Sequence, residues 1–586
     1  MTTDIDHRGP DARGVQVLDS PNGHRATLGA VRLRIIDLAP AADQPLADAS
    51  GEVWVAFNGE LYNFRELRAE LVAAGFAFRS SSDTECLVNL YRHLGGDVDR
   101  MLSRLRGMFA FALFDTTTGR AVLARDRLGI KPLHWVPTAG GLVFCSEQRP
   151  LARVGAVSGA FDENAVAGYL AKGVVPSGTR FLRDVRQLGP GESLTWDGGE
   201  PKIERYWRPV FTMRADFGDR DLAARELRAS ITDSVERHLV ADRTVGVFLS
   251  SGTDSTAVAT IAARAGAPRS LTVRFPDEPE LDEGDDAATT ARALGLDHVE
   301  VPTTGADAVK LLPEFLRSID SPSSDAFNTW LVCRAARDAG LVVALSGTGG
   351  DELFAGYRTF QIVPRLKHAL AVTNRIPSPL RDSAARLLRT RARGRLLARA
   401  LQGGTGSAGA YHAMRRVFDD CEIAVTGLPA PALAGLPIDP GGIDAVTLLE
   451  LGSYLPDQLL LDTDSVSMAH SLEVRVPLLD DRVVATALAL PASVRVHGKQ
   501  LLATAAGLGP RPPKRTFTLP IETWMHGPLR ETVRNALFDH DLPFGDVLPD
   551  SFRTRVWDDF DAGRAHWTKA WSVAVLRLWP GANALV

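Results

Sequence analysis

Short apolar runs separated by clusters of Gly, Asp and Thr dominate the chain up to about Trp207. They read VWVAFNG (53–59), MFAFALFD (108–115), AVLARD (121–126) and LVFCSE (142–147). Runs of this length between turn-forming residues predict β-strands. We therefore expect a first domain rich in β-sheet.

The pattern changes after a polar stretch at residues 214–221. Apolar runs such as TVGVFL (244–249), SLTVRF (270–275) and LVVALSG (341–347) now alternate with helical periodicity. This alternation predicts a parallel sheet covered by helices. Residues 381–399 predict an arginine-bearing helix, whose charged side is either a solvated face or a surface for a partner. We place the two domains at residues 1–208 and 222–586.

A loop rich in small polar residues follows the first of these predicted strands. SSGTDS (250–255) leads directly into the helical pattern AVATIAARAG (257–266). Backbone N–H groups, hydroxyls and the positive end of a helix dipole together favour a phosphate-type anion. Asp254 would repel a bare phosphate, which indicates a bridging magnesium ion. The alternative is an ordinary capped turn, since no Walker-type GK[ST] follows.

The same theme returns at the end of a later predicted strand. LVVAL (341–345) is followed by SGTGG (346–350) and then by the acids Asp351 and Glu352. Ligands bind at the carboxyl edge of parallel sheets, where neighbouring strand ends meet. Asp254 and Asp351 are therefore candidates for two ligands of one ion.

Motifs along nearly the whole chain, in order, are similar to one known family. They are HRGPD (7–11), FNGELYN (57–63), SDTE (82–85), LRGMFAFALFD (105–115), ARDRLGIKPL (124–133), SSGTDS (250–255), SGTGGDELFAGY (346–357) and LLLDTDSVSMAHSLEVRVPLLD (459–480). The chain resembles glutamine-hydrolysing asparagine synthetases and related amide-forming enzymes. This resemblance implies an α+β αββα sandwich of the N-terminal-nucleophile (Ntn) hydrolase type, truncated at its N-terminus. It also implies a C-terminal α/β ATP-pyrophosphatase domain with a parallel sheet.

The resemblance also implies a chemistry. ATP and Mg²⁺ convert a carboxylate into an acyl-adenylate, pyrophosphate leaves, and an amine attacks the activated carbonyl; fixed cations and donors stabilise the charge that develops. In the family, glutamine would supply ammonia to this reaction through an internal tunnel between the domains, and the resemblance makes a homodimer the expectation.

The implied site residues fall into four groups. Pyrophosphate would be held by Ser250, Gly252, Asp254 and Ser255, and the nucleotide site would be lined by Leu249, Val273, Ser346 and Gly347. Magnesium would be bound by Asp254 and Asp351. The catalytic candidates are Lys499, Thr348 and Glu473. The glutamine pocket would consist of Arg32, Asn58, Gly59, Glu60 and Asp83. For Glu473 and Arg475, a structural ion pair is an equal alternative.

The largest departure from the family concerns the glutaminase nucleophile. The family uses an N-terminal cysteine whose α-amine acts as the base, and this sequence has none before HRGPD. Thr2 would become N-terminal after removal of Met1, but it falls where the family has a helix. Two hypotheses explain a glutamine pocket without its nucleophile. Either Met1 is an internal methionine of a longer reading frame, or the domain is an inactive scaffold and the amine comes from elsewhere.

Four smaller departures lie in the synthetase motifs. Ser251 replaces a usual glycine, Ser321 a common glutamate and Ser465 a common arginine. Thr348 stands where asparagine-forming members carry an acid, and a threonine hydroxyl does not act as a base near neutral pH. These changes indicate a substrate pocket that differs from that of ordinary asparagine synthesis.

Three functions remain open. The first is an ATP-dependent amide-forming ligase, either an asparagine synthetase or a natural-product amidotransferase. The second is a macrolactam cyclase of the lasso-peptide type, which uses an amine of its own substrate. The third is a pseudoenzyme scaffold, against which the intact Asp254, Asp351 and Lys499 argue.

Composition narrows the setting. A chain of 586 residues with 45% apolar residues is expected to form at least two soluble domains. Its net charge of -5 argues against nucleic acid as a partner, and no apolar run approaches the roughly 20 residues of a membrane span. The four cysteines, which are not paired in sequence, and the lack of a signal-like start predict a cytoplasmic protein. The sequence leaves open which carboxylate is activated, which amine attacks and the oligomeric state.

Overall fold

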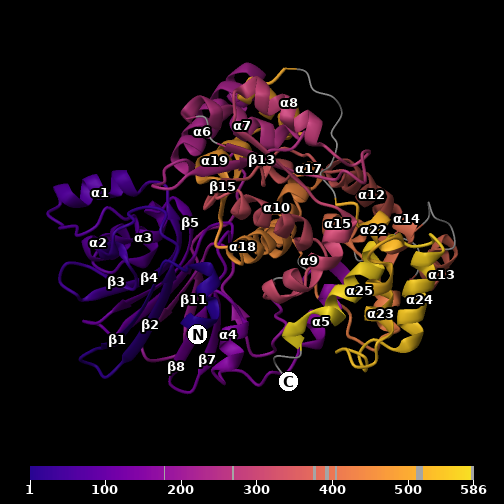
Figure 1. Ribbon diagram of the computed structural model, residues 1–586, viewed down its shortest axis with the longest axis horizontal. Helices are drawn as coiled ribbons and strands as arrows, with labels where there is room; N and C mark the ends of the chain where they lie inside the picture. Colours follow the sequence, from indigo (N-terminus) through magenta and orange to yellow (C-terminus); the bar gives the residue numbers. More distant parts are fainter. Residues whose placement is uncertain are drawn as a thin grey trace.

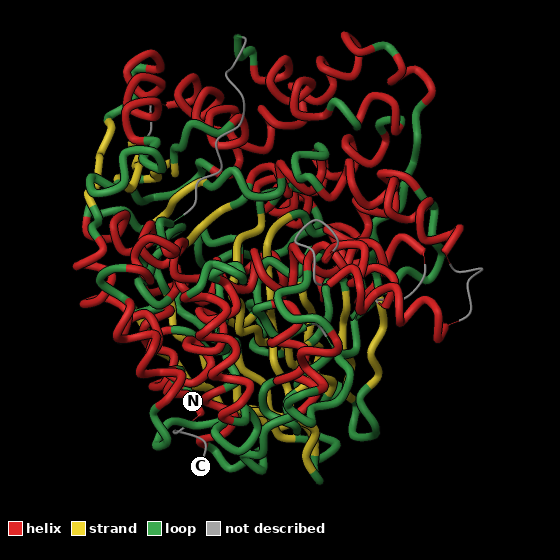
Figure 2. Tube along the Cα trace, turned by 90° about the vertical axis from the view of Figure 1, so that its right-hand side faces the viewer, coloured by secondary structure: helices red, strands yellow, loops and turns green. Residues whose placement is uncertain are grey.

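The computed structural model describes residues 1–176, 178–266, 269–373, 378–389, 395–402, 406–433, 435–509 and 519–582. Strands gather at the lower left of Figure 1, in the early part of the chain, and helices dominate the remainder. In the view turned by 90°, strands run through the middle of the molecule with helices around them (Figure 2). No helix among the described residues is long and apolar enough to cross a membrane.

The first domain is a sandwich of antiparallel sheets. One layer has six strands in the order β11-β10-β6-β5-β4-β3, and the other consists of the pair β1-β2 and the sheet β8-β7-β9. The strands are β1 (Ala12–Asp19), β2 (Arg25–Arg32), β3 (Leu46–Ala47), β4 (Val53–Leu61), β5 (Gly107–Asp115), β6 (Arg120–Arg125), β7 (His134–Thr138), β8 (Gly141–Cys145), β9 (Arg186–Gln187), β10 (Glu192–Trp196) and β11 (Lys202–Arg205). The helices are α1 (Phe64–Ala73), α2 (Thr84–His93), α3 (Val98–Arg104), α4 (Arg149–Arg153) and α5 (Glu163–Lys172).

Strand β5 shows why this sheet is covered on both faces. Its residues alternate between two apolar clusters because successive side chains of a strand point to opposite sides. Phe109, Phe111 and Leu113 pack with residues of α1, α2 and α3. Ala110, Ala112 and Phe114 pack against β1, β2 and β7 of the other layer. The continuous apolar run that predicted a strand therefore belongs to the centre of an αββα arrangement.

The second domain is built on a five-stranded sheet in the order β14-β13-β12-β15-β16, and every neighbouring pair is parallel. Its strands are β12 (Val245–Phe248), β13 (Arg269–Arg274), β14 (His298–Pro302), β15 (Val343–Leu345) and β16 (Glu473–Arg475). The helices up to residue 402 are α6 (Arg220–His238), α7 (Thr253–Gly266), α8 (Gly284–Leu294), α9 (Gly305–Ser318), α10 (Ala326–Asp338), α11 (Gly350–Leu353), α12 (Thr359–Thr373), α13 (Ser378–Arg389) and α14 (Arg395–Gln402). The later helices are α15 (Gly406–Arg415), α16 (Asp420–Ala424), α17 (Gly442–Leu449), the π-helix η5 (Glu450–Leu460), α18 (Leu461–Met468), α19 (Asp481–Ala489), α20 (Ala492–Arg495), α21 (Gly498–Ala506), α22 (Ile521–His526), α23 (Arg530–Phe538), α24 (Asp550–Asp561) and α25 (Thr568–Leu578).

The strand order positions the two glycine-rich loops. From β12 the chain first proceeds outward through β13 and β14, and then returns to the other side of β12 to form β15 and β16. The loops that follow β12 and β15 therefore leave the same edge of the sheet as neighbours. Such a reversal of strand order opens a crevice for ligands in parallel sheets.

The fold class predicted from the sequence is confirmed in both domains. Within the junction, the predicted start of the second domain at residue 222 falls inside the first turn of α6. Asp219 caps that helix by accepting from the backbone N–H groups of Asp221 and Leu222. The last residues of the polar stretch therefore form the start of α6. The predicted helix over residues 381–399 is represented by α13 and α14, and residues 390–394 lie outside the described residues.

Ion pairs join the two domains. Arg106 lies 2.7 Å from the carboxylate of Asp480 and 2.6 Å from that of Asp233. Arg8 lies 2.6 Å from Asp464, and both side chains are buried. These contacts hold the sandwich against the parallel-sheet domain.

Candidate active sites

The loop after β12 is folded around its own hydroxyl groups. The Oγ atoms of Ser250 and Ser255 lie 2.9 Å apart, and the backbone N–H of Gly252 donates to Ser250 Oγ at 3.2 Å. Helix α7 begins at Thr253, inside the loop, so the positive end of its dipole lies there. This geometry suits the anion site that the sequence predicts for Ser250, Gly252, Asp254 and Ser255.

The loop after β15 touches this first loop. A Cβ atom added at Gly347 would lie 2.7 Å from the backbone nitrogen of Ser255, and one at Gly350 would lie 2.4 Å from Asp254 Cγ. Glycine is required at both positions because any larger residue would force the loops apart. Ser346 and Thr348 belong to the same loop, and their hydroxyl oxygens lie 2.9 Å apart.

Asp254, Asp351 and Lys499 meet at this edge of the sheet. Lys499 Nζ contacts both carboxylate oxygens of Asp254 and lies 2.7 Å from Asp351 Oδ1. Burial alone would lower the pKa of Lys499, but the two carboxylates outweigh burial and the pKa is raised. The lysine therefore carries its charge between the two acids.

This arrangement offers a place for a divalent cation. Among the described residues there is no group of three or more His, Cys, Asp or Glu side chains that would bind a metal by itself. Magnesium is typically held by one or two carboxylates together with oxygens of bound phosphates. Asp254 and Asp351 fit that pattern. In this structure the positive charge between the two carboxylates is that of Lys499 Nζ.

Two further nucleotide-site candidates are core residues. Leu249 and Val273 are almost fully buried in the apolar clusters on either face of the sheet. Leu249 N–H also donates to the carbonyl of Leu271 across the neighbouring strand. Their proposed contact with a nucleotide would therefore come from the backbone at the sheet edge.

Glu473 does not join this group. It begins β16 and pairs with Val343, whereas the glycine-rich loop follows the opposite end of β15. Its carboxylate instead accepts from Arg475 Nε at 2.7 Å, and the fully buried Arg475 also donates to Glu60 Oε2 at 2.8 Å. The ion-pair alternative for Glu473 and Arg475 is therefore observed. A direct catalytic role for Glu473 stays a prediction.

The link from Arg475 to Glu60 could not be read from the sequence, because the two residues lie 415 positions apart. The only available signal was the Glu-x-Arg spacing, which places both side chains on one face of a strand. The backbone carbonyl of Arg475 also accepts from Ser346 N–H at 2.8 Å. One buried arginine thus contacts both the glutamine-pocket candidates and the loop after β15.

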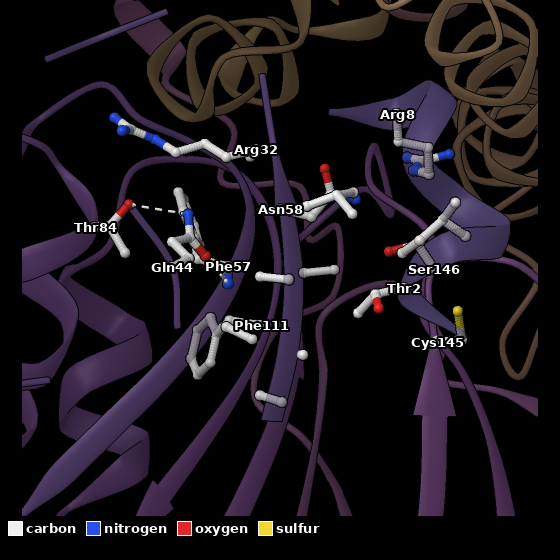
Figure 3. Close-up of a pocket in the computed structure, with 18 of the residues that line it drawn as sticks. Thr2, Arg8, Arg32, Gln44, Phe57, Asn58, Thr84, Phe111, Cys145 and Ser146 are labelled. Atoms are coloured by element: carbon white, nitrogen blue, oxygen red, sulfur yellow. Dashed lines mark hydrogen bonds between the residues drawn. The ribbon is translucent and has the colours of Figure 1, made fainter. Parts of the chain in front are cut away.

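A cavity of about 520 Å³ contains the predicted glutamine pocket. It is lined by parts of β2, β4 and β8 and by all five predicted residues. Arg32 and Asn58 are labelled among them in Figure 3. Asn58 Nδ2 and Glu60 Oε1 are buried without a hydrogen-bond partner. Buried polar atoms are normally paired. Because both residues line this cavity, they favour a polar ligand there.

Carboxylates at one end of this cavity favour a cationic ligand group. Burial and the neighbouring Asp83 raise the pKa of Glu60 well above its ordinary value, although Arg475 opposes the shift. Asp83 also accepts from Leu61 N–H at 2.9 Å, and burial raises its pKa. A bound ammonium group would stabilise both carboxylates in their ionised form.

Arg32 is directed differently from the prediction. Its guanidinium donates to Asp43 Oδ1 at 2.9 Å and to the carbonyl oxygens of Ile36 and Asp37 at 2.9 and 2.6 Å. Figure 3 shows it pointing away from Asn58. It would have to give up some of these contacts to bind a ligand carboxylate.

Thr2 and Cys145 are the nucleophile-type side chains labelled beside Ser146 in this cavity (Figure 3). Burial raises the pKa of the Cys145 thiol to about 12. A thiol with so high a pKa remains protonated near neutral pH and is inert. Cys145 therefore does not replace the missing cysteine of the family.

Two of the substituted positions lie close to each other at the domain interface. Asp320 N–H donates to Ser465 Oγ at 3.4 Å, and the buried Oγ of the adjacent Ser321 lacks a partner. Small hydroxyl residues occupy positions where larger charged side chains are common in the family. A substrate pocket that extends to these two serines would have more space than one lined by the larger charged side chains.

The structure has the two parts of an amidotransferase of the ATP-dependent amide-ligase class. The first is an αββα sandwich with a polar cavity. The second is a parallel sheet with two glycine-rich loops and the Lys–Asp–Asp cluster. Comparison with known proteins gives the family. Residues 1–207 match the glutamine amidotransferase domain model and residues 226–580 match the asparagine synthase model. The chain belongs to the glutamine-hydrolysing asparagine synthetase family.

Individual relatives agree with this assignment. A putative asparagine synthetase [glutamine-hydrolyzing] of Mycobacterium tuberculosis H37Rv is 34% identical over 98% of this chain and 91% of that protein. Asparagine synthetase [glutamine-hydrolyzing] 1 of Bacillus subtilis is 29% identical over 100% of this chain and 93% of that protein. Amidase chry2 of Gibberella zeae is 31% identical over 61% of this chain and 54% of that protein. The family thus includes relatives described both as synthetases and as amidases.

Proposed function

We propose that the protein activates a carboxylate with ATP as an acyl-adenylate and converts it into an amide. The observation that carries this proposal is the cluster of Lys499, Asp254 and Asp351 at the carboxyl edge of the parallel sheet. A fixed cation beside two potential magnesium ligands suits the departure of pyrophosphate, since negative charge builds up there.

Each part of the site has a separate task. The hydroxyls and N–H groups of the loop 250–255 bind the β- and γ-phosphates. Lys499 leaves its ion pairs to contact the phosphates and the adenylate. A magnesium ion bound by Asp254 and Asp351 would supply further neutralising charge. Thr348 and Ser346 line the route by which the amine reaches the acyl carbon.

The identity of the carboxylate is the finer part of the proposal. Thr348 offers no base for the incoming amine, and Ser321 and Ser465 alter the side chains near the interface. These differences favour a natural-product amidotransferase over ordinary asparagine synthesis. The match of 61% of this chain to amidase chry2 of Gibberella zeae supports the same direction.

Glutamine is the proposed source of nitrogen. Asn58 Nδ2 would donate to the amide oxygen, and Glu60 and Asp83 would bind the α-amine. Binding of glutamine does not by itself require a nucleophile, but hydrolysis does. Since Cys145 is protonated, glutamine hydrolysis by these residues alone would be slow, and free ammonia or a substrate amine is the alternative donor.

Exchange of labelled pyrophosphate into ATP tests the adenylation step without any amine. Aspartate and a panel of other carboxylates are offered in turn, and AMP formation is then measured with ammonia, with glutamine and with neither. We expect one carboxylate to support exchange and ammonia to support AMP formation. If none of the offered carboxylates supports exchange, only the scaffold function remains. AMP formation with neither nitrogen donor would indicate the cyclase.

A further inference from the structure

A second hollow lies apart from both candidate sites. It has a volume of about 470 Å³ and is formed by residues of α14, α16, α24 and α25 and the segments next to them, at the right of Figure 1. Most of its lining residues carry a charge, and the cations among them are Arg399, Arg416, Arg555, Arg564 and Lys569. Ligand pockets commonly measure about 300–1,000 Å³. The volume alone therefore permits a small-molecule ligand.

Arg399 contributes a positive charge for which no carboxylate among the described residues forms an ion pair. Its Nη1 donates to the carbonyl oxygen of Arg416 at 3.0 Å, and its Nη2 donates to that of Val417 at 3.2 Å. Carbonyl oxygens hold the guanidinium in place without neutralising it. Arg399 thus presents a fixed cation at one wall of the hollow.

Arg416 adds a buried donor beside it. Its side chain is 7% exposed and pairs with Asp420, but its Nε has no hydrogen-bond partner. Leaving a buried charged donor unpaired costs about 1–3 kcal/mol or more. Because Arg416 lines the hollow, a small shift of its side chain would let this donor pair with a ligand oxygen.

The opposite wall has two cations that share one acid. Arg564 Nε donates to Asp559 Oδ1 at 2.9 Å, and Arg555 Nε lies 3.9 Å from the other oxygen of the same carboxylate. Lys569 pairs with Glu422, and Asp419 caps α16 by accepting from Glu422 N–H. The acids of the hollow are therefore used, and positive charge remains in excess.

His566 adds a ring nitrogen to the lining. Its Nδ1 lies 2.6 Å from Thr568 Oγ1 and 3.4 Å from the backbone nitrogen of Thr568. The side chain is exposed, so a ligand can reach the ring. Ion pairs explain the positions of Lys569 and Arg564, but they explain neither Arg399 nor the unpaired Nε of Arg416.

We propose that this basic hollow, formed by Arg399, Arg416, Arg555 and Lys569 with His566, binds a small phosphate-bearing ligand with at least two negative charges. Guanidinium groups bind phosphate through paired hydrogen bonds in a geometry that ammonium groups do not offer. The site is independent of the amide-forming reaction, because none of its residues belongs to the ATP or glutamine pockets.

Binding of inorganic phosphate provides the first test. The thermal unfolding midpoint of the full chain is followed as phosphate replaces chloride at constant ionic strength. Two variants change the hollow: Arg555→Glu at its rim, where the side chain is 70% exposed, and Arg399→Gln, whose amide still donates to a carbonyl oxygen. Arg292→Glu on the exposed surface of α8 makes the same charge change elsewhere.

We expect phosphate to stabilise the wild type and Arg292→Glu equally, and both hollow variants to need at least tenfold more phosphate for the same shift. Lys499→Ala, in contrast, should keep the effect, which separates this hollow from the ATP site. Equal phosphate dependence in the wild type and in both hollow variants would overturn the proposal. A crystal soaked in tungstate should show the anion beside Arg399 and Arg416, and density only at the ATP loops would also overturn it.

Discussion

The two candidate sites of the proposed reaction differ in how their charged groups are satisfied. At the sheet edge, Lys499 lies between Asp254 and Asp351, so the cation and its two acids already satisfy one another. In the sandwich cavity, Asn58 Nδ2 and Glu60 Oε1 are buried without partners. The first site is assembled before its substrate arrives, whereas the second requires a ligand to complete its hydrogen bonds.

Their chemistry differs in the same way. The sheet edge brings together the hydroxyls, the lysine and the two carboxylates that are proposed to bind ATP and magnesium. The cavity holds the groups that are proposed to bind an amide and an ammonium, and burial raises the pKa of its Cys145 thiol to about 12. The groups proposed to bind a substrate can therefore be changed separately from the groups proposed to react with it, at the sheet edge and in the cavity alike.

The largest expected effect comes from Arg475, the fully buried residue that contacts both regions. Arg475→Met leaves Glu60 and Glu473 without their cation. Removing one member of a buried ion pair typically costs about 3–5 kcal/mol, and we expect a loss of this size in urea unfolding. The double variant Glu60→Gln/Arg475→Met should recover a large part of it. A loss below 1 kcal/mol would contradict a role in joining the two regions.

The next effect concerns the sheet edge alone. Lys499→Ala should lower the rate of pyrophosphate exchange by about 100- to 1,000-fold, because one fixed stabilising group of the transition state is lost. Glutamine should raise the unfolding midpoint of this variant as much as that of the wild type. If both responses fall together, the two sites are not separable.

A smaller effect with a defined pH dependence is expected in the cavity. Burial and Asp83 raise the pKa of Glu60 above its value in the unfolded chain. Between these two pKa values, the folded chain binds more protons than the unfolded chain. The free energy of unfolding of the ligand-free protein therefore falls as the pH rises from the lower to the higher value. An ammonium group prefers ionised Glu60. The midpoint shift caused by glutamine should therefore grow with pH.

Scanning fluorimetry across a pH series checks this behaviour. Glu60→Gln should weaken the pH dependence of the glutamine shift and leave only the part due to Asp83, and glutaramic acid, which lacks the α-amine, should not show it in the wild type. A glutamine shift that decreases with rising pH would contradict the assignment of Glu60.

The smallest expected effect tests the departure at Thr348. Thr348→Glu places an acid in the loop after β15 and should increase amide formation from ammonia by about tenfold, less than the roughly 100-fold that a well-positioned base contributes, because this pocket is not shaped around an acid. Pyrophosphate exchange should remain unchanged. Thr348→Gln, which has similar size but no basic group, serves as the control, and an equal gain in both variants would rule out base catalysis as its cause.

The sequence predicted more of the sheet edge than of the cavity, for a physical reason. SSGTDS and SGTGGDE each carry an acid at a fixed distance from a strand end, and parallel strands bring their ends together. The position of Lys499 beside both acids followed from the family motif. Neither local pattern nor motif indicated that Glu473 points to Glu60 through Arg475, because that contact depends on how the two domains pack.

The engagement of Arg32 was also outside the reach of sequence reasoning. Its partners Ile36, Asp37 and Asp43 belong to a nearby irregular segment whose path is set by tertiary contacts, such as that of Asp37 N–H with Asp242. By contrast, β4, β5, β6 and β8 of the first domain and β12, β13 and β15 of the second could be predicted, because each is an apolar run bounded by turn residues.

The division of one sandwich layer has a practical consequence. Strands β2 and β8 each end their sheet, and the short helix η1 (Thr2–Arg8) packs against β2 where a strand would otherwise pair. Backbone amides along such margins readily recruit strands from other molecules. Because η1 covers β2, a variant that loosens η1 is expected to expose this margin and to precipitate at a lower concentration than the wild type.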